Sequence, residues 1–179
     1  MREITPPEND IQRIILKKRA AALAVEPKED GTENDLIEIV EFLLADEYYA
    51  IESVFISEVC HLKDLTPIPC TPAFVLGVIN LRGTILSVID LRTFFELPNK
   101  GLSDLNKVIV LNDGVMEFGI LADVIRGVRL ISVKTLQASL PTLTNIRADY
   151  LKGVSEERLV VLDGGKILSD QRMVVHEDV

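Results

Sequence analysis

Histidine and cysteine are the residues of this chain best suited to metal binding or nucleophilic catalysis, and the chain holds only two of each. Cys60 and His61 are neighbours, whereas Cys70 and His176 lie farther along. No pair has the spacing of zinc ligands, so packing is favoured over a metal site. Neighbouring residues in a strand point to opposite faces, so Cys60 and His61 cannot act as nucleophile and base.

Three aspartates, Asp90, Asp123 and Asp163, end apolar runs and could supply paired carboxylates for acid–base catalysis. Each also precedes a turn or a possible helix start, where a carboxylate accepts backbone N–H bonds, and we favour this capping role. The run Asp163-Gly164-Gly165-Lys166 lacks the context of a phosphate-binding loop and is predicted to be a turn. The sequence therefore predicts no enzyme active site, no metal and no cofactor.

One arginine has a setting that suggests binding instead. In the segment TPAFVLGVINLRGTILSVIDLRTFFEL, residues 71–97, two β-branched runs over 75–81 and 84–91 flank a break that permits only a tight reversal. This pattern predicts a β-hairpin with Arg82 at its tip. An always-charged guanidinium on a rigid hairpin is well placed to bind a carboxylate, either within the fold or on a partner.

Glu58 interrupts an apolar strand and could be the carboxylate that faces Arg82. Such a pair would hold the hairpin in a defined orientation. The apolar Leu81 beside the charged Arg82 also resembles an interface hot spot. Internal bracing and partner binding are equally favoured by the residues themselves, and both stay open.

The elements that position these residues are mostly strands. Strand-like patterns cover 37–44, 48–51, 54–62, 75–81, 84–91, 107–111, 115–121, 125–131 and 159–162. A short helix capped by Asp90 is expected over 91–97. Phe74-Val75-Leu76-Gly77-Val78 is echoed by Tyr150-Leu151-Lys152-Gly153-Val154, and each is followed by an apolar strand that ends in Asp. This repeat predicts two small β-barrels or curled sheets packed together, each too small to be stable alone.

The first 35 residues differ from the rest. A Gly-free and Pro-poor run predicts an amphipathic N-terminal helix over 6–25, and a polar linker follows over 28–35. Residues 36–179 form the second predicted region, which holds both barrels. The helix could pack on its own barrels or recruit a partner.

Composition sets limits on location and partners. The net charge of −9 argues against nucleic acid, and 47% hydrophobic residues suffice for a buried core. No apolar run approaches the roughly 20 residues that span a bilayer, so direct membrane insertion is not expected. The first ten residues lack the features of a signal peptide, and two cysteines make no disulfide framework. We therefore expect a cytoplasmic protein.

Several segments, in order, are familiar as a set. FLLADEYYAI, VFISEV and TPIPCTPAFVLGVINLRGTILSVIDLRTFFEL, followed by FGILADVI and YLKGV…RLVVLDGGKIL, resemble the CheW-like coupling proteins of bacterial chemotaxis. The resemblance covers about 36–169, and the GVINLRG…VIDLR core is a specific signal for that family. It departs from the family pattern at Ser87, which replaces a common proline, and at Gly127, where an acidic residue often precedes Val.

The resemblance implies a mainly β fold of two SH3-like five-stranded barrels with short connecting helices. It implies a non-enzymatic adaptor that links the cytoplasmic tip of methyl-accepting chemoreceptors to the regulatory domain of the chemotaxis histidine kinase. A coupling protein of a chemosensory-like pathway for twitching, gliding or development is an alternative, as is a small-molecule-binding β-barrel from a different class. The partner-binding residues that the resemblance implies are Arg82, Glu58, Asn80, Leu81, Gly83, Val54 and Ile56.

Overall fold

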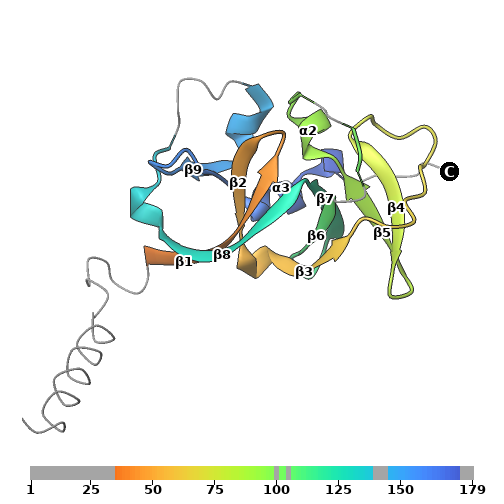
Figure 1. The fold of residues 1–179 in the computed structure, drawn as a ribbon, viewed down its shortest axis with the longest axis horizontal. Coiled ribbons are helices and arrows are strands. Elements are labelled where there is room, and N and C mark those ends of the chain that lie inside the picture. The colour runs from red at the N-terminus through yellow and green to blue at the C-terminus, as the bar shows by residue number, and fades with distance from the viewer. Residues whose placement is uncertain (1–34, 99–100, 104–105, 139–144, 174–179) are drawn as a thin grey trace, which may run out of the picture. The chain divides into compact units, whose positions relative to one another are not determined.

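Ten strands form two five-stranded sheets in this computed structural model, which describes residues 35–98, 101–103, 106–138 and 145–173 (Figure 1). The mainly β prediction with two five-stranded units is confirmed. The predicted N-terminal helix over 6–25 and nearly all of the polar linker lie outside the described residues.

Each sheet combines strands from both sequence repeats. Sheet A has the order β8-β1-β2-β10-β9, and sheet B has the order β3-β6-β7-β5-β4. The strands of sheet A are β1 (Leu36–Leu44), β2 (Glu47–Glu52), β8 (Val124–Ser132), β9 (Leu151–Val154) and β10 (Val160–Leu162). Those of sheet B are β3 (Ile56–His61), β4 (Val75–Leu81), β5 (Thr84–Ile89), β6 (Lys107–Asn112) and β7 (Glu117–Ala122).

The two sheets therefore do not correspond to the two halves of the sequence. Sheet B is one uninterrupted stretch of chain from β3 to β7, whereas sheet A takes β1 and β2 from one end and β8 to β10 from the other. The chain crosses between the sheets twice. The first crossing is the 3-10 turn η2 (Ser53–Phe55), and the second is the single residue Asp123 between β7 and β8.

A matching bridge closes each sheet into a barrel, which we call barrel A and barrel B. In barrel B, Thr66 and Val78 exchange two backbone hydrogen bonds of 2.8 Å each. In barrel A, Gln137 and Val154 do the same with two bonds of 2.9 Å. The segment that makes each bridge follows the third strand of its repeat, β3 or β8.

The repeated glycines of the sequence lie at these closures. A Cβ on Gly77 would lie 2.2 Å from the carbonyl oxygen of Thr66, and the backbone φ of Gly77 is +143°. A Cβ on Gly153 would lie 2.7 Å from the Cβ of Leu136. The close approach of two backbones leaves no room for a side chain at either position. The repeated segments around Gly77 and Gly153 therefore mark the positions at which the two barrels close.

Alternate residues of the central strands enter different cores. On β6, Val108 and Val110 pack inside barrel B, whereas Ile109 and Leu111 join a larger cluster that also takes Phe42 and Tyr49 from sheet A. This larger cluster lies between the barrels. Side chains alternate across a strand, so β6 is buried on both faces. Burial on both faces explains why this strand is an unbroken apolar run.

Short helices complete the fold: α2 (Leu91–Phe94), α3 (Gly164–Ser169) and the 3-10 segments η3 (Val133–Thr135), η4 (Asn145–Tyr150) and η5 (Gln171–Met173). The expected cap is present, because the side chain of Asp90 accepts a hydrogen bond from the backbone N–H of Arg92. Asp163 caps α3 through the N–H of Lys166, so the turn predicted over 163–166 is wrong and the segment begins a helix.

Two further details of the sequence predictions are wrong. The extended segment predicted over 54–62 begins instead with the η2 turn, and β3 starts at Ile56. Asp123 is not a helix cap. Its carboxylate accepts hydrogen bonds from the backbone N–H of Ala45 in barrel A and from the side chains of Arg92 and Asn106 in barrel B, at 2.9 to 3.1 Å. Asp123 thus ties the two barrels together where the chain crosses between them.

Candidate functional site

The tip of the β4–β5 hairpin presents the side chain of Arg82. Both central residues of the turn have positive φ, 53° for Arg82 and 91° for Gly83, as a mirror-image two-residue turn requires. The side-chain oxygen of Asn80 accepts a 2.8 Å hydrogen bond from the N–H of Gly83. The turn therefore fixes the direction in which the arginine leaves the hairpin.

An ion pair joins this hairpin to β3. Nη2 of Arg82 lies 2.7 Å from Oε2 of Glu58, so the pairing that the sequence left open forms. The arginine side chain is 80% exposed, and that of Glu58 is 27% exposed. Exposed pairs of this kind stabilise a protein by at most about 1 kcal/mol. The guanidinium has five N–H donors and so keeps several for a carboxylate from outside. The pair orients Arg82 more than it stabilises the barrel.

Cys60 lies close to this pair, two residues after Glu58 on β3. Partial burial against the core of barrel B and the nearby carboxylate of Glu58 raise the pKa of the Cys60 thiol, and the charge of Arg82 opposes this only in part. The thiol therefore stays protonated near neutral pH, which does not favour a nucleophile.

The seven residues that the resemblance implied fall into two groups. Arg82, Glu58, Asn80 and Gly83 are linked by the ion pair and the turn bond, and Leu81 packs partly against the core of barrel B. Val54 and Ile56 lie instead around the first crossing between the barrels. Val54 is 74% exposed, whereas Ile56 packs partly against the cluster between the barrels.

A second exposed feature was missed in the sequence. Three apolar side chains on one face of the paired strands β1 and β8 are about half or more exposed: Val128 (60%), Leu130 (63%) and Leu36 (48%). The register places Val128 opposite the buried Val40, and Leu130 opposite Glu38. We call Leu36, Val128 and Leu130 the β8 stripe. Alternation in VIRGVRLIS predicted a strand, but only the tertiary structure shows that these three side chains are left exposed by the described residues.

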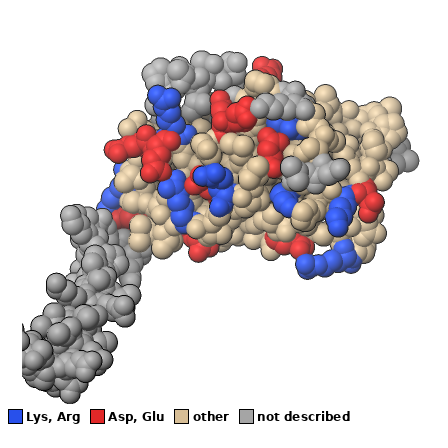
Figure 2. Space-filling view, in the orientation of Figure 1, with Lys and Arg blue, Asp and Glu red and all other residues tan. Residues whose placement is uncertain are grey.

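The charged side chains of the surface are mixed. On the face that Figure 2 shows, Lys and Arg are interspersed with Asp and Glu, without a continuous basic area. Within the described ranges, no three His, Cys, Asp or Glu side chains gather in a way that could hold a metal ion. The same part of the chain includes no helix long and apolar enough to cross a membrane.

Comparison with known proteins supports a single family. The model of the CheW-like domain matches residues 38–172. The chain is 32% identical to the chemotaxis protein CheW of Treponema pallidum, over 78% of this chain and 86% of that protein. It is 31% identical to that of Klebsiella aerogenes, over 79% and 87%, and 29% identical to Protein FrzA of Myxococcus xanthus, over 73% and 84%.

The structure agrees with these sequence similarities. The scaffolding protein TtCheW from Thermoanaerobacter tengcongensis superposes with a TM-score of 0.64 at 27% identity, and the match covers 76% of this chain and 88% of that one. The residues that the family model matches include the Arg82–Glu58 pair and, of the β8 stripe, Val128 and Leu130. The chain therefore belongs to the CheW-like domain family.

Proposed function

We propose that this protein is a non-enzymatic cytoplasmic adaptor that couples transmembrane chemoreceptors to the chemotaxis histidine kinase in bacterial signalling arrays. Membership of the CheW-like family and its similarity to chemotaxis and scaffolding proteins support this role. The observation that carries it is Arg82, which is 80% exposed yet held in one direction by its turn and by Glu58. A pre-oriented exposed arginine is typical of an interface anchor.

The two exposed features suit two partners of different chemistry. The Arg82 tip suits a surface with a carboxylate, and we assign it to the regulatory domain of the kinase. The β8 stripe suits the apolar face of an amphipathic helix, and we assign it to the helical cytoplasmic tip of a receptor. The two features lie on different barrels that share one buried cluster. A displacement at one feature would thus reach the other through packed side chains rather than through a flexible linker.

Substitution of Arg82 tests the role. We expect Arg82→Ala to reduce receptor-dependent kinase autophosphorylation about tenfold in a reconstituted mixture, as loss of a central interface arginine does. Its unfolding free energy should change by less than about 1 kcal/mol. Lys134→Ala is the matched control, because Lys134 is also an exposed cation, 67% accessible and paired with Asp35 on barrel A. Wild-type activation by Arg82→Ala would contradict the assignment.

A charge exchange separates partner binding from internal bracing. The double variant Arg82→Glu with Glu58→Arg restores an ion pair between the hairpin and β3 but reverses the charge at the exposed tip. If Arg82 only braces the fold, the double variant should activate the kinase normally. If Arg82 binds the kinase, the double variant should fail as the single variant does.

The pathway served is a separate question. The similarity to Protein FrzA supports a second candidate function. In that role the protein would be the adaptor of a chemosensory-like pathway that controls twitching, gliding or development. A pull-down from the native organism, with this protein as bait and mass spectrometry as readout, would separate the two. Recovery of flagellar-pathway receptors and kinase supports the first role, and recovery of a distinct receptor–kinase set supports the second.

A further inference from the structure

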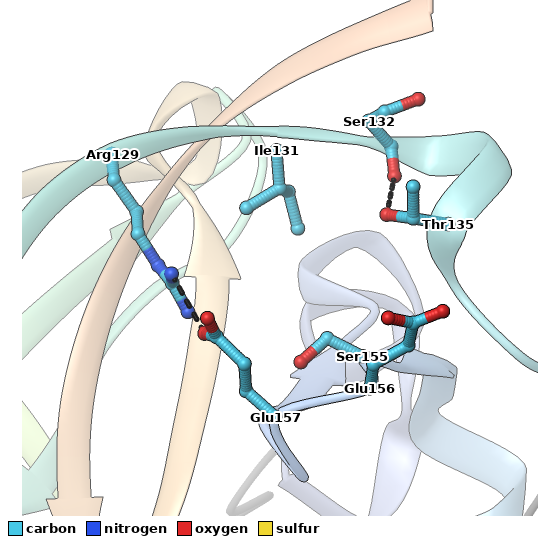
Figure 3. Close-up of a pocket in the computed structure, with 7 residues that line it drawn as sticks. All are labelled: Arg129, Ile131, Ser132, Thr135, Ser155, Glu156 and Glu157. Atoms are coloured by element: carbon cyan, nitrogen blue, oxygen red, sulfur yellow. Dashed lines mark hydrogen bonds and ion pairs between the residues drawn. The ribbon is translucent and has the colours of Figure 1, made fainter.

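A pocket of about 270 Å³ opens at one end of barrel A, between the end of β8 and the turn that joins β9 to β10 (Figure 3). Its lining combines one arginine, two glutamates, three hydroxyl side chains and one isoleucine: Arg129, Ile131, Ser132, Thr135, Ser155, Glu156 and Glu157. A single water needs roughly 10–15 Å³ on this measure, so the pocket has room for the end of a long side chain.

Beneath the pocket lies an ion pair that barrel B does not have. Nε of Arg129 is buried and lies 3.1 Å from Oε2 of Glu41, without a directed hydrogen bond. The third strand of each repeat, β8 or β3, skips one residue at a bulge, after Ile125 in β8 and after Ile56 in β3. Counting from the bulges, the equivalents of Arg129 and Glu41 are Cys60 and Val110. Barrel B closes with these two uncharged residues, so the fold itself does not require the charged pair.

The hairpin tips extend this comparison. In barrel B, the cation Arg82 on the β4–β5 tip pairs with the anion Glu58 on the third strand. In barrel A, the anion Glu157 on the β9–β10 turn pairs with the cation Arg129 on the third strand, with Nη1 to Oε2 at 3.0 Å. Each barrel therefore has one ion pair between its hairpin tip and the strand β3 or β8, with the charges exchanged and at strand positions that are two residues apart in the repeat. The exposed member is a cation in barrel B and an anion, 72% exposed, in barrel A.

The charge balance decides which ligand the pocket suits. Glu41 and Glu157 already share the single guanidinium of Arg129, and Glu156 makes no ion pair with another described residue. Three carboxylates thus face one cation. Figure 3 shows Glu157 beside Arg129 on one side of the hollow and Glu156 below Thr135 on the other, so a carboxylate borders the hollow on each side.

We propose that this pocket is a docking site for a lysine or arginine side chain of a protein partner, distinct from the Arg82 tip and the β8 stripe. The cationic group would lie between Glu156 and Glu157, where the hydroxyl oxygens of Ser155 and Thr135 are further acceptors. Its aliphatic stem would lie on Ile131. The proposal does not depend on the chemotaxis role, because it concerns a different surface and a different charge.

A titration of the full-length protein with short peptides tests this site. Acetyl-Gly-Arg-Gly-amide is added to the ¹⁵N-labelled protein and the amide shifts are followed by NMR. The same peptide with citrulline keeps the size and loses the charge, and one with glutamate reverses it. We expect saturable shifts at Thr135 and Ser155–Glu157 with the arginine peptide, and weaker binding at 0.5 M salt because exposed ion pairs are screened.

Substitutions identify the carboxylates. We expect Glu156→Gln with Glu157→Gln to weaken binding of the arginine peptide roughly fivefold, from the loss of two exposed ion pairs. Should the double variant disturb the fold, Glu156→Gln alone carries the test, because that side chain makes no ion pair with another described residue. Glu96→Gln, an exposed carboxylate on barrel B, is the control and should bind like the wild type.

Three results would overturn the proposal. The first is equal binding of the citrulline and arginine peptides. The second is tighter binding of the glutamate peptide, which would show that Arg129 rather than the glutamates receives the ligand. The third is the absence of localised shifts at millimolar peptide.

Discussion

Closure of barrel B depends on the absence of a side chain at Gly77, and replacing this residue by alanine should open the barrel. The added Cβ would lie 2.2 Å from the oxygen and 2.8 Å from the carbon of the Thr66 carbonyl, and 2.9 Å from the Cα of Pro67. All three are backbone atoms, so the overlap cannot be relieved by rotation of a side chain. The segment at Thr66 must shift and the bridge to Val78 must lengthen.

The expected magnitude follows from what the shift removes. The two bridge hydrogen bonds of 2.8 Å contribute about 1 kcal/mol each. The φ of +143° at Gly77 adds a backbone penalty of about 1–3 kcal/mol for any L-residue. We therefore expect Gly77→Ala to lower the free energy of unfolding by about 3–5 kcal/mol, measured by urea denaturation.

Gly127 provides a matched control. Its φ is +146°, almost that of Gly77, but no atom lies within 4 Å of the position of a Cβ. Gly127→Ala should therefore incur the backbone penalty alone and be about 2 kcal/mol less destabilising than Gly77→Ala. Equal losses in the two variants would show that the close approach at Thr66 is not what requires glycine, and the closure argument would fail.

Three further predictions concern the buried and short-range polar contacts. Arg92→Met should lower the unfolding free energy by about 3–5 kcal/mol in urea denaturation, because it removes the buried guanidinium that pairs with the fully buried Asp90; a loss under about 1 kcal/mol would contradict this. Hydrogen bonds from Arg172 lower the pKa of Asp170 to about 2. The contribution of the Asp170 carboxylate to the unfolding free energy is therefore complete above about pH 4 and is lost as the pH falls toward 2. Asp170→Asn should abolish this part of the pH dependence in thermal unfolding, and an unchanged acid limb would refute it. Asp163→Ala should remove the cap of α3 and lower the unfolding free energy by about 1 kcal/mol. Asp163→Asn should retain most of the capping stabilisation, because asparagine is also a good cap.

Local chemistry explains what could be predicted from the sequence. The hairpin with Arg82 at its tip and the cap at Asp90 both rest on short-range rules, namely turn length and cap type. Charge complementarity made Glu58 a possible partner of Arg82, but the sequence left that pairing open, and the structure forms it. The repeated glycines also predicted two similar units. Their physical reason, a backbone approach at each closure, became visible only in three dimensions.

The remaining features depend on contacts between distant parts of the chain. Nothing local shows that β1 and β2 pair with β8 and β10, because which hairpin completes which barrel is settled by packing. Asp123 looked like a cap because it follows an apolar run, but it bonds groups on both barrels. The exposure of Val128 and Leu130 likewise depends on where the other described strands and turns pack, which no local pattern shows.

Barrel B is formed by one continuous segment of the chain, and this has a consequence for folding during translation. As the chain leaves the ribosome, β1 and β2 emerge before the other strands, yet their neighbour β8 follows only after about 70 further residues have been added, and β10 later still. At about 5–20 residues per second, that interval lasts roughly 4–14 s. Barrel B has all five of its strands before β8 is synthesised, so it can fold during translation. During that interval, the β1–β2 hairpin still lacks the strands that pair with its two edges. Unpaired strand edges can pair with other chains, so we expect the nascent chain to be more prone to aggregation than the folded protein.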